Sequence, residues 1–247
     1  MKNYSYNKIA YDYHLKRKKP WKPLQQFLDY LNNRGYKFNG NCIDLGCGNG
    51  RNFKIFISFP DVKIIGIDNS LEFLKIARNR LQNPNHFSKI EQNSVQLILG
   101  DLKCLPIRDN SVQNIFSIAS IHHIEKNLER EKVINHIYNI LEKKGKFLLT
   151  VWRRWQKKFR FFFIKDWISR KFNPKYNALQ KKKGLYEFGD KFVPWTVSNK
   201  GIKYQRFYHF FSKREIKKLL KIFKIEELCI MGGPTNKDNI FMLTQKV

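Results

Sequence analysis

Short apolar segments alternate with helical segments along residues 41–152, and this alternation limits the possible fold more than any other feature. Helical patterns lie between the apolar segments, for example at residues 70–81 and 128–141. Five apolar segments have the length and the β-branched or aromatic content of buried strands: CIDLG (42–46), VKIIGID (62–68), VQLILGD (95–101), VQNIFSIAS (112–120) and KFLLTVW (146–152). Because parallel strands need helical crossovers, this order predicts a doubly wound α/β sheet.

The tail predicts two further strands of a different kind. A helical pattern at 212–222 is followed by KIEELCIMGG (224–233) and NIFMLTQK (239–246), with Gly232, Gly233 and Pro234 in the turn region. Apolar runs joined by a short, turn-rich link form antiparallel pairs. We therefore expect a seven-stranded, mostly parallel, Rossmann-like sheet with a C-terminal antiparallel hairpin. Residues 1–247 are expected to form one domain, and residues 153–190 a basic aromatic insertion or lid within it.

The charge of the chain favours a polyanionic partner. Lysine and arginine number 48 against 20 acids, which gives a formal net charge of +28. Such a balance indicates nucleic acid or an anionic membrane surface, unless it reflects only a lysine-rich composition. No stretch has the length of a membrane-spanning helix, and the N-terminus lacks the apolar core of a signal peptide. We therefore expect a cytoplasmic protein and no membrane partner. The four cysteines form no C-x-x-C pair, so we also expect no metal site.

A glycine-rich turn, IDLGCGNGRN (43–52), follows the first strand and predicts a ligand site. Its glycines let the backbone approach a ligand where a Cβ would collide. The spacing differs from the G-x-G-x-x-G pattern of dinucleotide sites, and Asp44 lies in the turn, where a carboxylate would repel a pyrophosphate. A cationic ligand with a ribose and no phosphate, S-adenosylmethionine, fits these residues better.

Acids at the ends of three successive strands support this ligand. Asp68 ends the second strand, where such acids accept hydrogen bonds from ribose hydroxyls. Asp44 would face the amino group of the methionine part, and Asp101 the adenine amino group. Each acid alone could instead cap a loop. The residues expected to bind the cofactor are Asp44, Gly46, Cys47, Gly48, Asn49, Asp68, Asn69, Asp101, Leu102 and Ala119.

Further motifs along nearly the whole chain carry a family resemblance. They are RKKPW (17–21), SIASIHHI (117–124), VW (151–152), FVPW (192–195) and RFYHFF (206–211), in addition to the glycine turn. The sequence resembles class I S-adenosylmethionine-dependent methyltransferases. More closely, it resembles the tRNA wobble-uridine enzymes that esterify 5-carboxymethyluridine, including the methyltransferase domain of the AlkB-homologue fusion. It departs from that family at KDNI (237–240), where R-D-N-W is usual, and in its longer, more basic segment 153–183.

The resemblance implies a reaction and two partners. The reaction is methyl transfer to a carboxylate of the wobble uridine in the tRNA anticodon loop. The first partner is therefore tRNA, and the second is a small zinc-binding activator subunit that adds to the methyltransferase sheet. A carboxylate is already ionised at neutral pH, so the enzyme needs to supply orientation and a dry cavity rather than a base.

Six residues are candidates for binding or catalysis at the acceptor. Arg17 and Arg206 could clamp phosphates or the carboxylate, because a planar guanidinium binds an oxyanion through two hydrogen bonds. Trp195 and Tyr208 could stack an unpaired base. His122 is expected to point toward the pocket. His209 is the sixth candidate. Four of the six have a structural alternative: Arg17 as a solvated charge, Trp195 and Tyr208 as packing, and His209 as a core histidine; of His122 and His123, one is expected to be structural.

The segment 153–183 has twelve lysines or arginines, one acid and several interleaved aromatic rings. This composition suits an RNA backbone with exposed bases, an ordinary helical insertion, or a helix on anionic lipid. Two other functions therefore remain open for the whole chain. It could be a small-molecule or lipid methyltransferase with a membrane-contacting insertion, or a binding protein that has lost catalysis.

Overall fold

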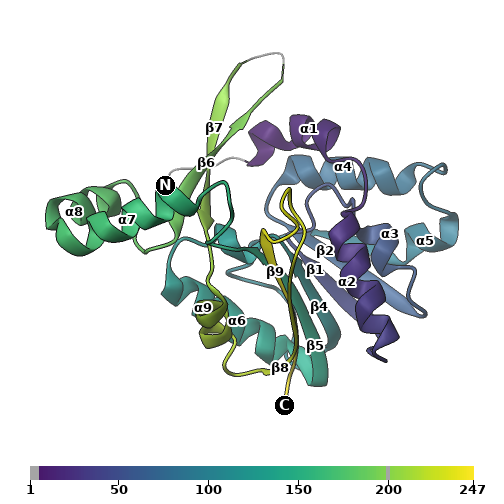
Figure 1. The fold of residues 1–247 in the computed structure, drawn as a ribbon. Helices are drawn as coiled ribbons and strands as arrows, with labels where there is room; N and C mark the ends of the chain where they lie inside the picture. The colour runs from purple at the N-terminus through teal and green to yellow at the C-terminus, as the bar shows by residue number, and fades with distance from the viewer. Residues whose placement is uncertain (1–5, 199–200) are drawn as a thin grey trace.

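The computed structural model describes residues 6–198 and 201–247. A seven-stranded sheet forms its centre, in the order β3-β2-β1-β4-β5-β9-β8 (Figure 1). Its strands are β1 Gly40–Leu45, β2 Val62–Asp68, β3 Val95–Leu99, β4 Val112–Ile118, β5 Leu141–Trp152, β8 Lys224–Met231 and β9 Asn239–Gln245. Strands β1 to β5 pair in parallel, whereas β9 runs antiparallel between β5 and β8. The expected doubly wound sheet with its C-terminal antiparallel hairpin is thus confirmed.

Helices cover both faces of this sheet, which explains why its strands are apolar on both sides. The helices are α1 Tyr6–Lys16, α2 Lys22–Asn33, α3 Phe53–Phe56, α4 Leu71–Gln82, α5 Lys89–Asn93, α6 Asn127–Ile140, α7 Arg160–Phe172, α8 Pro174–Lys182 and α9 Lys213–Leu219, with a 3₁₀ turn, η1, at Ile121–His123. Buried side chains of α6 and α9 pack on one face. Those of α2, α3 and α4 pack on the other.

Two strands stand apart from the main sheet. Strands β6 (Asp190–Thr196) and β7 (Lys203–His209) form an antiparallel ribbon that rises beside α1 (Figure 1). The ribbon contains two of the motifs that carry the family resemblance, FVPW in β6 and most of RFYHFF in β7, with Val193 opposite Arg206 and Trp195 opposite Tyr204. Sequence analysis did not predict these strands. Pro194 and the turn residues around them obscured the pattern, and a two-stranded ribbon tolerates a proline that a central strand does not.

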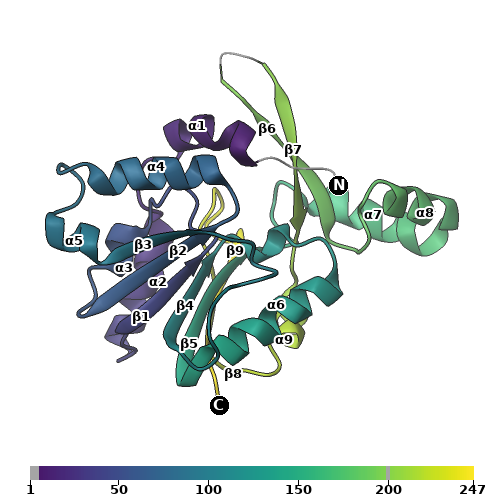
Figure 2. The ribbon, with the colours of Figure 1, turned by 180° about the vertical axis from the view of Figure 1, so that it is seen from behind.

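The basic segment forms a helical arm. Helices α7 and α8 project from one end of the molecule, away from the main sheet (Figures 1 and 2). A small apolar cluster anchors the arm to the base of the ribbon, and it contains Phe159, Phe163, Val193, Tyr208 and Phe210. Among the described residues, no helix is both long enough and apolar enough to cross a membrane.

Candidate active site

The glycine turn lies at the carboxyl ends of the parallel strands, where open α/β sheets bind ligands. Gly46 has φ +74°, and a side chain there would collide with Ser120. Gly48 has φ +55°, and a Cβ added there would meet no atom within 4 Å. Open space directly above a left-handed glycine allows a ligand to approach the backbone closely.

Asp44 is a buried carboxylate with an unused acceptor. Its side chain ends β1 at 2% exposure, and its Oδ1 has no hydrogen-bond partner among the described residues. Burial, helped by the neighbouring Asp68, raises the pKa of Asp44 to about 8. A buried polar group without a partner is costly, so this position suits a ligand that brings a cationic donor. The amino group of S-adenosylmethionine is such a donor.

Asp68 holds the glycine turn in place from the end of β2. Its Oδ2 accepts from the Gly48 backbone N–H at 2.8 Å, and its Oδ1 accepts from the Ser70 N–H at 2.9 Å. Burial raises the pKa of Asp68, although these two hydrogen bonds oppose the effect. Each carboxylate oxygen can accept a further hydrogen bond, so the geometry is compatible with ribose hydroxyls at this strand end.

The other predicted cofactor residues lie around this turn in different environments. The Asn49 side chain points to the N-terminal segment, where it donates to the Arg17 carbonyl at 3.1 Å and contacts His14 Nδ1 at 3.2 Å. Asn69 and Asp101 are exposed and Leu102 is half-buried. Asp101 accepts from the Lys103 N–H, which leaves its second oxygen available.

Cys47 and Ala119 complete the set. Burial raises the pKa of the Cys47 thiol well above its usual value, so this side chain stays protonated and uncharged. Ala119 has φ +56°, a strained value for a residue with a side chain. Its N–H donates to both the carbonyl and the hydroxyl of Thr150, which fixes this turn at the end of β4.

Arg206, on β7, provides a buried cation whose charge acts on Tyr6 of α1, as does the charge of Asp68 at the end of β2. It is only 9% exposed, and its guanidinium carbon lies 4.7 Å from the Trp195 ring centre and 5.1 Å from that of Tyr208. Among the described residues, no acid forms an ion pair with it, and its Nε has no hydrogen-bond partner. A buried cation without a carboxylate is costly, so this position suits a ligand that brings a negative charge.

The proposed base stacking on Tyr208 and Trp195 does not match the geometry. Tyr208 is buried, with Trp152 stacked on it at 4.3 Å and His122 and His123 at 4.9 and 4.4 Å. The Trp195 ring is covered by Tyr13, and its Nε1 donates to Asp12 at 2.7 Å. Both rings therefore form the wall around Arg206. They do not offer an open face to a base.

His122 lies in the same wall and is neutral. Its Nδ1 accepts from the Trp152 backbone N–H at 3.2 Å, so the ring proton of neutral His122 is on Nε2. Burial and the cationic surroundings lower the pKa of His122 well below its ordinary value. Its buried Nε2 has no partner among the described residues. His122 can therefore donate a hydrogen bond to a ligand, but it has no free lone pair with which to act as a base.

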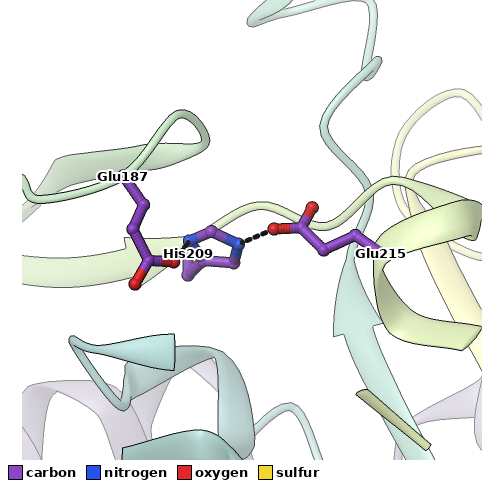
Figure 3. Close-up of side chains that lie close together, drawn as sticks. All are labelled: Glu187, His209 and Glu215. Atoms are coloured by element: carbon purple, nitrogen blue, oxygen red, sulfur yellow. Dashed lines mark hydrogen bonds and ion pairs between the residues drawn. The ribbon is translucent and has the colours of Figure 1, made fainter. Parts of the chain in front are cut away.

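His209 is a structural residue in this arrangement. Its Nδ1 lies 2.6 Å from Asp190 Oδ1 and its Nε2 lies 2.8 Å from Glu215 Oε1, as Figure 3 shows for Glu215. Both ring nitrogens are therefore engaged by carboxyl groups. Glu187, also drawn in Figure 3, pairs with Arg130, and Glu215 also pairs with Arg154. The cluster is thus a network of hydrogen bonds and ion pairs that ties the ribbon to α9 and occupies both nitrogens of His209.

Sequence analysis missed the part played by α1. Tyr6 contacts His123 Nδ1 at 2.9 Å, and Asp12 accepts from the Ser198 N–H at 2.7 Å in addition to Trp195. On the cofactor side, Ser70 donates to the Asn7 side chain at 2.6 Å. The helix therefore links the glycine turn to the ribbon. No local signal marks these residues, because their partners lie far away in sequence.

Arg17 follows α1 at the rim of this site. Its side chain is exposed and, within residues 6–198 and 201–247, donates only to the neighbouring Lys16 carbonyl. Burial raises the pKa of Tyr208 to about 12, and the positive charges of Arg206 and Arg17 oppose that rise. Arg17 can therefore meet an anionic ligand that enters from solvent.

Comparisons with known proteins agree with this geometry. Residues 43–149 match the family model described as "Methyltransferase domain". The tRNA (carboxymethyluridine(34)-5-O)-methyltransferase of Schizosaccharomyces pombe is 28% identical over 224 residues, which cover 87% of this chain and 84% of that protein. The enzyme of the same name from Saccharomyces cerevisiae is 31% identical over 147 residues, which cover 60% of this chain and 46% of that protein.

Solved structures with lower identity share the fold. A methyltransferase from Methanosarcina mazei described as SAM-dependent superimposes with a TM-score of 0.67 at 17% identity, covering 88% of this chain and 97% of that one. A glycopeptide N-methyltransferase in complex with S-adenosylmethionine gives a TM-score of 0.61 at 14% identity, covering 90% and 94%.

Proposed function

We propose that this chain, which has the domain and fold of an S-adenosylmethionine-dependent methyltransferase, methylates a carboxylate carried by the wobble uridine of tRNA. The cofactor is S-adenosylmethionine. The observation that carries the choice of acceptor is Arg206, a buried cation with no acidic partner in the described chain. The names of the fungal relatives support the same acceptor, a carboxymethyl group on uridine 34.

In this mechanism the side chains of the chain bind and orient the acceptor. Arg206 holds one carboxylate oxygen or both, the Nε2–H of His122 donates a second hydrogen bond, and Arg17 meets the RNA at the rim. Asp44, Asp68 and the glycine turn hold the cofactor, which when bound supplies an activated methyl group. The aromatic wall excludes water, and orientation in such a site can provide most of the acceleration.

The chemical step should be nearly independent of pH between about 6 and 9. A carboxylate with a pKa near 4 stays ionised across this range. His122 and His123 stay neutral, because burial keeps the pKa of His122 well below its usual range and that of His123 at about 3. Single-turnover rates at saturating tRNA and cofactor measure this directly. His122→Gln, which keeps a donor, should lower the rate no more than a few-fold.

A different acceptor would produce a different profile. A ring nitrogen or a hydroxyl needs a base, so the rate would rise through a pKa near that of histidine. If that rise is seen and His122→Gln removes it, the carboxylate mechanism is wrong and His122 is the base.

The proposed function itself is tested in cells. Nucleoside mass spectrometry of bulk tRNA from cells with and without this protein should show loss of the methyl ester and accumulation of the free carboxymethyl nucleoside at the wobble position. Unchanged nucleosides in cells without the protein would refute the assignment.

We also propose that an activator subunit adds to the β3 edge of the sheet. Strand β3 is the last strand on that side, and edge strands offer unpaired backbone groups for strand addition. Leu99 and Ile90 are strongly exposed there. A pocket of about 240 Å³ lies beside the same strand, with Leu97, Val95 and Leu81 in its wall.

The subunit proposal predicts that the chain purified from its natural source comes with a small zinc-containing protein. Ile90→Asp should remove that protein and leave S-adenosylmethionine affinity unchanged, because Ile90 is exposed on α5 and is not a residue of the strand ends that carry Asp68 and Asp101. Mass spectrometry and zinc analysis of the purified material measure this. Full activity of a monodisperse, isolated chain would contradict the proposal.

A further inference from the structure

The arm of α7 and α8 exposes aromatic rings that a folded core would ordinarily cover. Phe161 is 82% exposed and Phe172 is 70% exposed, and Trp167 between them is about half exposed. Phe163 points the other way and is fully buried against the base of the ribbon. Helix α7 thus has one apolar face that anchors it and a second that meets solvent. A second apolar face of this kind indicates a binding surface.

The charges around these rings are almost all positive. Segment 153–183 contains one acid, Asp166, which is buried and bound to Arg170 and Tyr176. The exposed cations of the arm have no acidic partner among the described residues, and they include Lys158, Arg160, Lys165, Lys171, Lys175 and the lysines at 181–183. The partner of this surface is therefore polyanionic.

Aromatic rings and cations lie next to one another on the arm, and this arrangement favours RNA over lipid as its partner. The Lys171 ammonium lies 5.3 Å from the ring centres of both Trp167 and Phe172. Inserting these rings into a bilayer would draw the ammonium in with them. A single-stranded nucleic acid instead presents bases to rings and phosphates to cations along the same path.

The arm is continuous with the wall of the proposed acceptor site. Phe163 packs edge-on against Phe210, and Phe210 contacts Trp152. Trp152 is in turn stacked on Tyr208, beside Arg206. An RNA whose wobble nucleotide reached Arg206 would have its neighbouring backbone close to the base of the arm.

From these observations we infer that the α7–α8 arm is a second RNA-binding surface, which holds the tRNA outside the acceptor pocket through its lysines and the rings of Phe161, Trp167 and Phe172. The inference rests on the proposed function. It adds a contact that the tRNA makes away from the reacting group.

The test compares two triple variants with the same change in charge. The arm variant is Lys165→Gln/Lys171→Gln/Lys175→Gln. The control variant is Lys37→Gln/Lys63→Gln/Lys143→Gln, whose lysines are exposed near the amino ends of strands, opposite the site. Affinity of the full-length protein for unmodified tRNA is measured at several salt concentrations. We expect the arm variant to bind about tenfold more weakly, with a slope of log affinity against log salt that is shallower by about 2.

Two further variants distinguish the contribution of the aromatic rings to tRNA affinity from that of the aliphatic side chains. Phe161→Ala/Phe172→Ala should lower tRNA affinity by about tenfold, since stacking on each ring is lost. Ile164→Ser/Ile168→Ser, on the same outer face, should leave tRNA affinity unchanged. With a short oligonucleotide that carries only the wobble uridine and its neighbours, the penalties of the arm and ring variants should disappear.

The outcomes distinguish this inference from the proposed function. If wild-type protein methylates tRNA and the arm variant binds it as tightly as the control variant does, the arm inference is wrong and the function stands. If wild-type protein does not bind tRNA, the proposed function fails. Should the isoleucine variant lose binding to phosphatidylserine vesicles while all variants keep their tRNA affinity, the arm is a lipid-binding surface and the inference is overturned.

Discussion

Replacing Arg206 by methionine is expected to lower kcat/KM for tRNA methylation about 100-fold and to leave S-adenosylmethionine affinity nearly unchanged. Methionine fills similar space between Trp195 and Tyr208 but removes the charge-assisted hydrogen bonds to the acceptor, each of which contributes about 1.5–3 kcal/mol. Steady-state kinetics and calorimetry of the two ligands measure the two effects separately.

Two controls make the Arg206 result specific. Arg214→Met removes an exposed cation from α9 and should leave methylation unchanged. Arg206→Lys keeps the charge without the planar pair of donors and should recover only part of the rate. If Arg206→Met methylates tRNA at the wild-type rate, the acceptor is not held by this cation and the carboxylate proposal loses its main support.

Replacing Asp44 by asparagine should have opposite effects on cofactor binding and on stability. Affinity for S-adenosylmethionine should fall by about 100-fold, because a charged acceptor for its amino group is lost. The free protein should become more stable. Burial raises the pKa of Asp44 to about 8, far above the value of 3.8 in an unfolded chain. Between those values the folded state binds the extra proton, so raising the pH destabilises the wild-type protein by on the order of 5 kcal/mol at most.

The direction in which stability changes with pH can be tested by comparing melting temperatures. Asparagine cannot titrate, so the variant should melt at a higher temperature than wild type at pH 8, and this difference should shrink steadily as the pH falls toward 4. In wild-type protein, cofactor binding should release a proton between about pH 5 and 7, and affinity should rise with pH there. Asp109→Asn, at an exposed position, is the matched control. Equal affinity and equal melting curves for Asp44→Asn would exclude it as the cofactor's partner.

The main sheet could be predicted from the sequence because its signals are local. Each buried strand is a continuous apolar run, and β1 and β2 carry an acid near or at their carboxyl ends, as at Asp44 and Asp68. The turn that follows β1 needs glycine, since Gly46 and Gly48 have positive φ values. Strand pattern and turn chemistry therefore specify this half of the site without knowledge of the rest of the chain.

The other half of the site depends on contacts between distant residues. Trp195 is covered only because α1 brings Asp12 and Tyr13 to it, and no local pattern around residue 195 shows that. His209 resembled a catalytic residue in sequence, but Asp190 and Glu215 take both of its nitrogens once the chain has folded. Arg206 was predicted to bind an anion. Its burial without an acidic partner, which gives that prediction its weight, emerges only from the packing of the ribbon.

The most direct test of the central claim is the chemical nature of the product. Purified protein, with the proposed activator subunit where one co-purifies, is incubated with isotope-labelled S-adenosylmethionine and tRNA that carries the free carboxymethyl group. The nucleosides are then analysed by mass spectrometry before and after mild alkali. The account predicts one labelled methyl group on the wobble uridine, released by alkali as expected for an ester, and none on tRNA that lacks the carboxylate. A methyl group that survives alkali, or labelling of tRNA without the carboxymethyl group, would contradict it.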